Sequence, residues 1–488
     1  MSVTTIYDQV RYPSRPLWVT HPYALGAMAR LHGLPTAPAE RCRLLDIGCG
    51  EGGNLLPMAA ALPDSRFLGI DLAGDAVAIG AESARALALR NVELKQANIL
   101  DVGRELGEFD YVIAHGVYTW VPTEVQERLL QLCAELLAPN GVAYISYNVY
   151  PGGYVREALR NLLLLHTKDV ADPYGKVSEA RTLLAALAED RRKPDPWQAV
   201  VRQEMEEFRK CAPEEIFHDD LAPEYHQVYF KDFAAQCSAH GLDYLSEAEL
   251  ADMTPFGFGQ RATATLEQLA SKDRILWEQY LDFFRFRKFR RTLLCRTEAP
   301  HNPAPDPAAL TGLYLSSQAQ RVESGDAESH RWKGADHAVI EIPDPDVSAL
   351  LQRLSAAWPE AIAGSELLRE TPGKEEALLD LCTIKFIQIH TSAPPAVRLR
   401  GGKPRFTRLA RSQAASGKTT NLYHFPIDIQ GDLAISLVQL ADGTRDRKSL
   451  IGELALRHPN HSVAGIAGGI DGQISELARL GLLTSVCE

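Results

Sequence analysis

The chain lacks the long apolar runs that would indicate a membrane span. None of its 488 residues lies in an apolar run near the roughly 18 residues that a spanning helix needs. The opening stretch MSVTTIYDQVRYP has no apolar core of the kind found in signal peptides. The eight cysteines are scattered, with no C-x-x-C, which is unlike a disulfide framework or a zinc site. These absences predict a cytoplasmic protein with reduced thiols, no segment inserted in a membrane and no metal site.

An excess of positive charge is also absent. The chain holds 63 acidic and 51 basic residues, a formal net charge of -12 at pH 7. Such a chain is a poor general partner for nucleic acid or an anionic membrane, so neither is expected. Its length exceeds what one hydrophobic core usually supports, which predicts two or three domains.

Between about residues 40 and 150, short apolar strands alternate with helical segments. RLLDIGCG, RFLGIDL, VELKQANIL and FDYVIAHGV are typical of strands, and AVAIGAESARALAL is typical of a helix. This alternation predicts a parallel sheet with helices on both faces. Two later segments, LDYLSEAEL and RRTLLCRT, are expected to complete the sheet. The charged, helical stretch 152–225 then becomes an insertion.

The stretch LLDIGCGEGGN joins the first strand to the first helix, which we expect to begin around 53–54. Gly48, Gly50 and Gly52 permit positive φ angles and a close approach of the backbone to a ligand. A G-x-G-x-x-G pattern alone is also compatible with a dinucleotide. Asp46, however, would repel two phosphates. It suits a ligand such as S-adenosylmethionine, which has a cationic centre, an ammonium group and no phosphate.

Two further polar residues follow the next two strands. Asp71 ends its strand about 20 residues after the glycines, where a carboxylate can accept both ribose hydroxyls; the alternative is a helix N-cap. Asn98 lies just beyond the third strand. It can read the adenine edge together with the backbone N–H of Ile99, or it can cap a turn.

In this order and spacing, LLDIGCGEGGN, FLGIDL, VELKQANILD, FDYVIAHGV and LLAPNGVAYIS resemble the successive motifs of class I S-adenosylmethionine-dependent methyltransferases. The resemblance implies S-adenosyl-L-methionine as cofactor. Asn98 departs from the Asp that is commoner in the family, but its amide oxygen can still bond the adenine amino group. The implied cofactor-binding residues are Asp46, Gly48, Cys49, Gly50, Asn54, Asp71, Leu72, Asn98, Ile99 and His115.

A narrower resemblance covers most of 1–297. YDQVRYPSRPLWVTHPYALGAMARLHGL, AHGVYTWVP and SYNVYPGGYVREALRNLL resemble bacterial methyltransferases with a methyltransferase regulatory domain. Some members are protein-lysine methyltransferases acting on outer-membrane proteins. The resemblance therefore implies a protein substrate and leaves a homodimer open. Two alternatives are a methyltransferase for a small molecule or glycan, and a non-catalytic regulator that binds S-adenosylmethionine.

The expected fold is α/β, a doubly wound Rossmann-like methyltransferase sheet with a helical insertion and a C-terminal α+β region. Within that last region, the helix pairs ending in IKFIQIHTSAP and ISELARLGLLTSV resemble winged-helix units. The expected domains are a cofactor-binding core with an N-terminal lid (1–151), the insertion (152–225), a regulatory segment completing the sheet (226–297), a proline-rich linker (298–310) and a C-terminal domain (311–488).

In such a fold the reacting centre lies beyond the ends of the first, fourth and fifth strands. The fourth strand is followed by His115, Tyr118 and Trp120, and the fifth ends near Asn148 and Tyr150. We expect the three aromatic residues to form a wall that attracts a sulfonium or amine by cation–π interaction. Asn148 would orient the acceptor. His115 is either a base or a hydrogen-bonded strand-end histidine.

Two other features have competing interpretations. Tyr7 and Tyr12 either close over the donor as a lid or are plain surface aromatics. The run RFRKFRR at 285–291 could grip nucleic acid or recruit an acidic protein. The favoured interpretation places Phe283, Phe286 and Phe289 in the core, with a solvated basic face.

Overall fold

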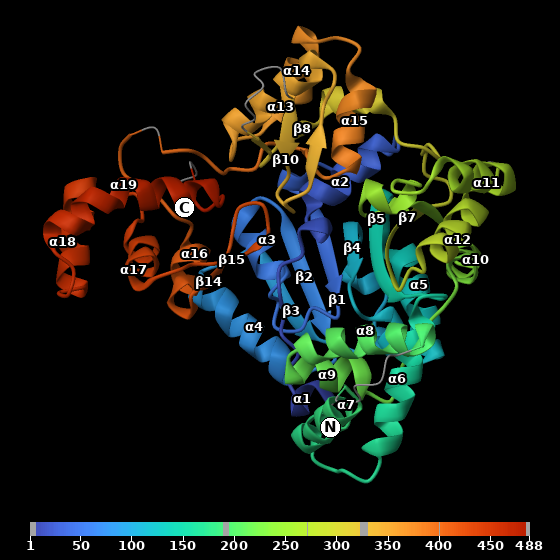
Figure 1. The fold of residues 1–488 in the computed structure, drawn as a ribbon. Helices are drawn as coiled ribbons and strands as arrows, with labels where there is room; N and C mark the ends of the chain where they lie inside the picture. Colours follow the sequence, from blue (N-terminus) through green and yellow to red (C-terminus); the bar gives the residue numbers. More distant parts are fainter. Residues whose placement is uncertain (1–5, 189–194, 271, 323–329, 400, 485–488) are drawn as a thin grey trace.

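The computed structural model describes residues 6–188, 195–270, 272–322, 330–399 and 401–484. Its centre is a seven-stranded sheet of order β3-β2-β1-β4-β5-β7-β6 (Figure 1). Within this sheet, β7 runs antiparallel to β5 and β6, and the other pairs are parallel. The expected fold class is confirmed. The strands are β1 (Arg43–Ile47), β2 (Arg66–Asp71), β3 (Val92–Gln96), β4 (Phe109–Ala114), β5 (Leu137–Asn148), β6 (Leu242–Glu247) and β7 (Phe289–Arg296).

Successive residues of the central strands enter two different hydrophobic cores. Leu44 joins the core on one face of the sheet and Leu45 the core on the other, and both are fully buried. Burial on both faces explains why these strands are apolar at consecutive positions. The covering helices are α2 (Pro22–Leu31) and α3 (Leu55–Ala61) on one face, and α5 (Thr123–Leu136) and α10 (Phe230–Ala239) on the other. In addition, α4 (Gly74–Ala86) packs along β2 and β3.

A helical insertion follows β5 and gathers near the N-terminal helix at one end of the sheet (Figure 1). It leaves and returns at one place, because Val149 pairs with Val228 and the Tyr150 N–H donates to the Val228 carbonyl at 3.1 Å. Its helices pack around their own small core, which also contains Val10. The helices of the insertion are α6 (Gly153–His166), α7 (Pro173–Ala188), α8 (Pro196–Lys210) and α9 (Pro213–Asp220), and the N-terminal helix is α1 (Ile6–Gln9).

The basic run 285–291 does not have the predicted arrangement. Helix α12 (Arg274–Arg285), which follows α11 (Gln260–Ala270), ends inside the run, and Phe286 turns the chain with a left-handed φ of 51°. The predicted core residues Phe283, Phe286 and Phe289 are 48%, 48% and 40% exposed. The prediction of a phenylalanine core is wrong because Phe286 and Phe289 lie beyond the end of the helix, and Phe283 lies on the exposed side of α12.

Arg290 from the same run is instead fully enclosed. Its guanidinium lies 2.6 Å from Glu247, 3.1 Å from Glu278 and 2.9 Å from Asp282, and it covers the ring of Phe230 at 3.9 Å. Burial raises the pKa of the Glu278 carboxyl to about 7, against the attraction of Arg290. One buried cation therefore joins β6, α12 and β7.

Beyond the sheet, the chain forms two packing units. The first shares a core with α2 and the adjoining sheet face, and the second has a core of its own. The first contains β8 (Tyr314–Ser316), β9 (Gln320–Arg321), β10 (Arg331–Lys333), β11 (Val339–Glu341), α13 (Pro345–Ala357), β12 (Ile362–Ala363), α14 (Gly364–Glu370), α15 (Glu375–Thr383) and β13 (Gln388–His390). The second contains α16 (Arg408–Gln413), β14 (Lys418–Thr420), β15 (Pro426–Asp428), α17 (Asp432–Leu440), α18 (Arg447–Arg457) and α19 (Val463–Arg479).

The proline-rich segment 298–310 is held against the end of α2. The Asn302 N–H donates to the His32 carbonyl at 2.6 Å, and the Asp306 N–H to the Leu31 carbonyl at 2.7 Å. The segment thus joins the sheet to the first C-terminal unit without being a loose spacer.

Among the residues that the structure describes, no helix is both long and apolar enough to cross a membrane. Seven of the cysteines lie in this described part and all seven are free thiols. Cys487 lies outside it.

Replacing Arg290 with alanine should lower the free energy of unfolding by about 3–5 kcal/mol, because it leaves buried carboxylates without their cation. Urea denaturation measures the change. Arg447→Ala is the matched control, because its ion pair with Asp471 is exposed to solvent and should contribute little to stability. Equal losses in the two variants would contradict the prediction.

Candidate functional site

The glycine turn after β1 directs backbone N–H groups toward the ends of the parallel strands. Gly48, Gly50 and Gly52 have φ angles of 79°, 53° and 73°, which side chains would strain. The N–H groups of Gly48 and Cys49 donate to the Ile70 carbonyl at 2.8 and 3.2 Å, which ties the turn to β2. The thiol of Cys49 is buried, so this residue can offer only its backbone to a ligand.

Asp71 holds the turns that follow β1 and β2. Its carboxylate accepts from the Gly50 N–H and from the Ala73 N–H, each at 2.8 Å. Burial raises the pKa of Asp71, and these backbone hydrogen bonds oppose that shift. Each oxygen retains a second lone pair, so Asp71 can still accept from ribose hydroxyls. The N-cap of α4 is Ala73 rather than Asp71.

Asp46 is a nearly inaccessible carboxylate beside the turn, with 3% of its surface exposed. Burial, and then the charge of Asp71, raise the pKa of Asp46 to about 7, while a hydrogen bond from Asn54 lowers it. Asn54 is itself buried against the segment 17–20. The side chain of Asn54, which was predicted to contact the cofactor, is hydrogen-bonded to the Leu17 N–H, the Thr20 hydroxyl and His424.

Apolar side chains lie open at the ends of β2 and β3. Leu72 is 39% exposed and Leu100 is 38% exposed, so they offer flat apolar surface of the kind that an adenine ring covers. Ile99, which directly precedes Leu100, is partly buried. The Asn98 side chain accepts from the Leu100 N–H at 3.1 Å, which is the turn-capping alternative. Leu100 was not predicted, although it directly follows Ile99.

The N-terminal segment covers the glycine turn. Arg11 donates to the Glu51 carboxylate at 2.7 Å, and the Gly53 N–H donates to the Ser14 hydroxyl at 2.8 Å. Tyr7 and Tyr12 both pack on a histidine of α9, although Tyr12 remains 42% exposed. Their ring centroids lie 4.4 and 5.5 Å from that of His218.

A second group of polar and aromatic residues lies at the end of β5. The Asn148 amide donates to the Tyr225 hydroxyl at 3.4 Å, and the rings of Trp120 and Tyr225 are 5.1 Å apart. Tyr150 stacks on Tyr154 at 4.2 Å and donates to Glu157 at 2.9 Å. Trp120 and Tyr150 therefore belong to two neighbouring aromatic groups. Tyr225 was missed because it lies far along the chain, in a segment without motif.

Tyr118 is not part of an aromatic wall. Its side chain is fully buried, its ring meets Phe233 edge-on at 5.2 Å, and its hydroxyl donates to Gln236. The residue opens a 3-10 turn, Tyr118–Trp120, in which successive side chains point in different directions. As a result, Tyr118 faces α10 while Trp120 faces Tyr225.

His115 is a hydrogen-bonded histidine at the end of β4. Its Nδ1 lies 3.0 Å from the Tyr144 hydroxyl and 3.1 Å from the Ser146 hydroxyl. Burial, and then the charge of Arg291, lower the pKa of His115 to about 4. The ring is therefore neutral at pH 7 and a weak base, which favours a positioning role over proton abstraction.

Asp219 is an acidic residue that sequence reasoning missed. It lies at the end of α9, where the Tyr12 hydroxyl donates to it at 3.4 Å. Burial, and then the charge of Asp220, raise the pKa of Asp219 to about 7, against the pull of Arg156. In the sequence, PEEIFHDD looks like an ordinary charged helix, so nothing there indicates burial.

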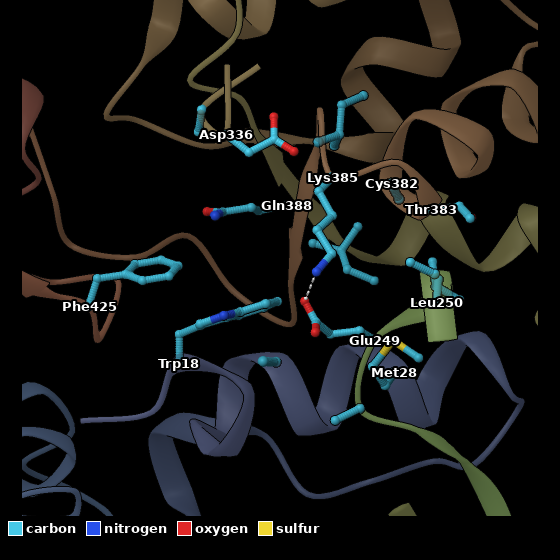
Figure 2. Close-up of a pocket in the computed structure, with 16 residues that line it drawn as sticks. Trp18, Met28, Glu249, Leu250, Asp336, Cys382, Thr383, Lys385, Gln388 and Phe425 are labelled. Carbon is cyan, nitrogen blue, oxygen red and sulfur yellow. Dashed lines mark ion pairs between the residues drawn. The ribbon is translucent and has the colours of Figure 1, made fainter. Parts of the chain in front are cut away.

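A separate cavity of about 220 Å³ lies between α2, the stretch 248–251 and β13 (Figure 2). Trp18, Met28 and Phe425 form part of its wall, and an ion pair of 2.8 Å joins Glu249 to Lys385 at its side. No residue of the glycine turn lines it, so it is distinct from the site described above.

Three family models match the chain. They are described as "Methyltransferase domain" over residues 44–141, "Predicted methyltransferase regulatory domain" over 212–296 and "PKMT, C-terminal winged helix domain" over 402–465. The last of these falls in the second C-terminal packing unit. It agrees with the winged-helix character predicted there.

Two curated relatives are proteins of Rickettsia prowazekii, both described as uncharacterized. RP789 is 34% identical over 298 residues, which are 61% of this chain and 53% of that protein. RP028 is 35% identical over 228 residues, which are 46% of this chain and 91% of that protein. The chain thus spans about half the length of RP789 and nearly all of RP028.

Among solved structures, PKMT2 from Rickettsia typhi in complex with AdoHcy superposes with a TM-score of 0.85 at 25% identity. The match covers 97% of this chain and 99% of that one. The glycine turn and its two carboxylates lie within the part of the chain that matches the methyltransferase domain. The chain belongs to the class I S-adenosylmethionine-dependent methyltransferases that carry a methyltransferase regulatory domain, and the resemblance found in the sequence is confirmed.

Gly53→Ala should loosen the N-terminal segment. A Cβ on Gly53 would lie 2.5 Å from the Ser14 carbonyl oxygen, and relieving such overpacking costs about 1–3 kcal/mol. Hydrogen exchange of residues 6–15 should therefore become faster. Gly452→Ala, in α18 with nothing within 4 Å of the added carbon, is the control. Unchanged exchange in Gly53→Ala would show that the segment is not held there.

Proposed function

We propose that the protein binds S-adenosylmethionine at the glycine turn and transfers its methyl group to an amine nitrogen. The observation that carries the proposal is the buried carboxylate of Asp46 beside a glycine turn with positive φ angles. A carboxylate there favours a cation and disfavours the phosphates of a dinucleotide. The AdoHcy held by PKMT2, which shares this fold, supports the same donor.

Each part of the site has a role in this proposal. Asp46 attracts the positive charge of the donor, Asp71 accepts from its ribose, and Leu72 and Ile99 flank its adenine. The donor, once bound, supplies a methyl group already activated on a positively charged sulfur. The chain therefore has to align the acceptor with that bond and exclude water. The N-terminal segment, through Tyr7 and Tyr12, serves the second task.

The acceptor that we propose is a lysine side chain of a protein. Its amine must lose a proton, which costs roughly 4.6 kcal/mol at pH 7 for a pKa near 10.4. Aromatic rings of Trp120 and Tyr225 attract the incoming ammonium, and partial desolvation beside them favours its neutral form. Asn148 orients the nitrogen lone pair. The N–CH3 bond forms as the S–CH3 bond breaks, and the amine proton passes to water.

Asp219 strengthens the case for a cationic acceptor. It is a half-buried carboxylate that lies next to the N-terminal segment, and partial burial already disfavours its charge. An ammonium group would relieve that cost, so the site favours a lysine over a neutral molecule. The winged-helix match to the PKMT family and the resemblance to bacterial protein-lysine methyltransferases agree with this choice.

A second candidate is methylation of a small molecule or glycan. One observation favours it: the N-terminal segment is docked on both the glycine turn and α9, through Arg11–Glu51 and Arg15–Glu215, which leaves a covered site. A protein acceptor requires that this segment move aside. We also propose that the protein works in the reducing cytoplasm, in keeping with its free thiols.

Donor affinity should depend on the charge of Asp46. As the pH falls through about 7 the carboxylate takes up a proton, so the dissociation constant of S-adenosylmethionine should rise, by up to about tenfold per pH unit. Asp46→Asn should weaken binding at pH 8 by at least about tenfold and abolish this pH dependence. Calorimetry checks both. Asp75→Asn, an exposed acid at the start of α4, is the control, and equal behaviour of the two variants would contradict the role of Asp46.

The acceptor class can be tested with radiolabelled donor and a host lysate separated into proteins and metabolites. Label should enter protein, as methylated lysine after hydrolysis, and Asn148→Ala should reduce its rate by about 10²-fold, as expected for a misplaced acceptor. Label confined to metabolites would establish the second candidate. Donor binding without any label would indicate a regulator.

A further inference from the structure

We infer that the cavity in Figure 2 is a second ligand site, which takes a small, neutral, planar heterocycle with an N–H donor. Because no residue of the glycine turn lines this cavity, the second site stands independently of the proposed function. A ligand bound there would lie where four parts of the chain meet.

The walls of the cavity come from segments that are far apart in the sequence. Trp18 belongs to the N-terminal part, and Ala248 falls within the match to the methyltransferase regulatory domain. Gln388 lies on β13 of the first C-terminal unit, and Phe425 ends the hairpin loop between β14 and β15, the C-terminal hairpin. No lining residue falls within 44–141, the part that matches the methyltransferase domain. The cavity is therefore a junction between parts.

The apolar part of the lining suits an aromatic ring. Trp18 and Phe425 stack with centroids 5.7 Å apart, and Met28 and Leu250 lie across the cavity from Phe425 (Figure 2). Aromatic faces and a thioether favour an aromatic guest. An apolar cavity of about 150 Å³ accepts benzene, so this cavity of about 220 Å³ has room for a bicyclic ring of about nine non-hydrogen atoms.

One polar group of the lining lacks a partner. Oε1 of Gln388 is buried and accepts no hydrogen bond from the residues that the structure describes. Its backbone is fixed by pairing with Ser316 of β8, and Figure 2 shows its amide extending between Asp336 and Phe425. A buried acceptor without a donor is costly, so a ligand N–H that reaches Oε1 would be favoured.

The charged groups beside the cavity already have partners, which favours a neutral ligand. One carboxylate oxygen of Glu249 lies 2.8 Å from Nζ of Lys385, and the other pairs with Arg291. Asp336 is open to solvent and accepts from the Ala338 N–H at 3.0 Å. A charged ligand would have to displace one of these partners and lose its own hydration.

The first experiment compares two bicyclic probes on the full chain by ligand-observed NMR. Indole has the ring N–H, and benzothiophene has nearly the same shape without it. Indole should bind saturably with a dissociation constant below about 1 mM, and benzothiophene about tenfold more weakly, because it cannot donate to Gln388. Bound indole should also slow hydrogen exchange of residues 421–425, since it holds Phe425 against Trp18. Absence of saturable indole binding would overturn the second site.

Two substitutions then locate the binding. Gln388→Met removes the acceptor at similar volume and should weaken indole about tenfold while leaving benzothiophene unchanged. Ala335→Leu enlarges an exposed residue of the lining and should weaken both probes at least about tenfold, because it fills part of the cavity. The matched controls are Gln352→Met and Ala338→Leu, which alter exposed residues outside the lining and should change neither affinity.

The variants also separate the failures. Equal losses of both probes in Gln388→Met would contradict the assigned hydrogen bond and with it the N–H class of ligand. Wild-type affinity for indole in Ala335→Leu would place the bound indole elsewhere and overturn the second site. Binding of S-adenosylmethionine, which tests the proposed function, should be unchanged in both control variants.

Discussion

The structure holds two carboxylates, Asp46 and Asp71, close together on neighbouring strands with little access to solvent. Their negative charges repel one another, and burial raises the pKa of both. Their charge is compensated by N–H groups from the glycine turn, from the start of α4 and from Asn54. The N-terminal segment packs on the same turn through Arg11 and Ser14, and the C-terminal hairpin contacts Asn54 through His424. Segments far apart in the sequence therefore meet at the donor site.

The sheet and the floor of the site could be predicted from the sequence, because both depend on local patterns. Strands buried on both faces require the consecutive apolar residues of 43–47, and a turn with positive φ requires glycine, as at Gly48 and Gly50. The position of Asp71 beside the glycine turn could be predicted because it ends the neighbouring strand. These features depend only on a strand, a turn and a helix in succession, and the observed sheet confirms the predicted fold class.

The residues that follow β4 and β5 are placed by contacts between distant segments, which no local sequence pattern reveals. Tyr118 and Trp120 are two residues apart, yet one enters the core against α10 and the other meets Tyr225. The phenylalanines at 283–289 follow helical spacing, but the helix ends at Arg285. Asn54 meets a histidine 370 residues away. Asp219 acquires its environment from Tyr12 and the packing of α9.

The insertion leaves the sheet at Val149 and rejoins it at Val228, side by side. The two connections between the insertion and the sheet are therefore in contact. The insertion can lengthen, shorten or be exchanged without altering the spacing of the strands, since closing a longer loop between fixed ends adds little free energy. Methyltransferases built in this way can change the part of the chain that meets the acceptor while the donor site stays the same.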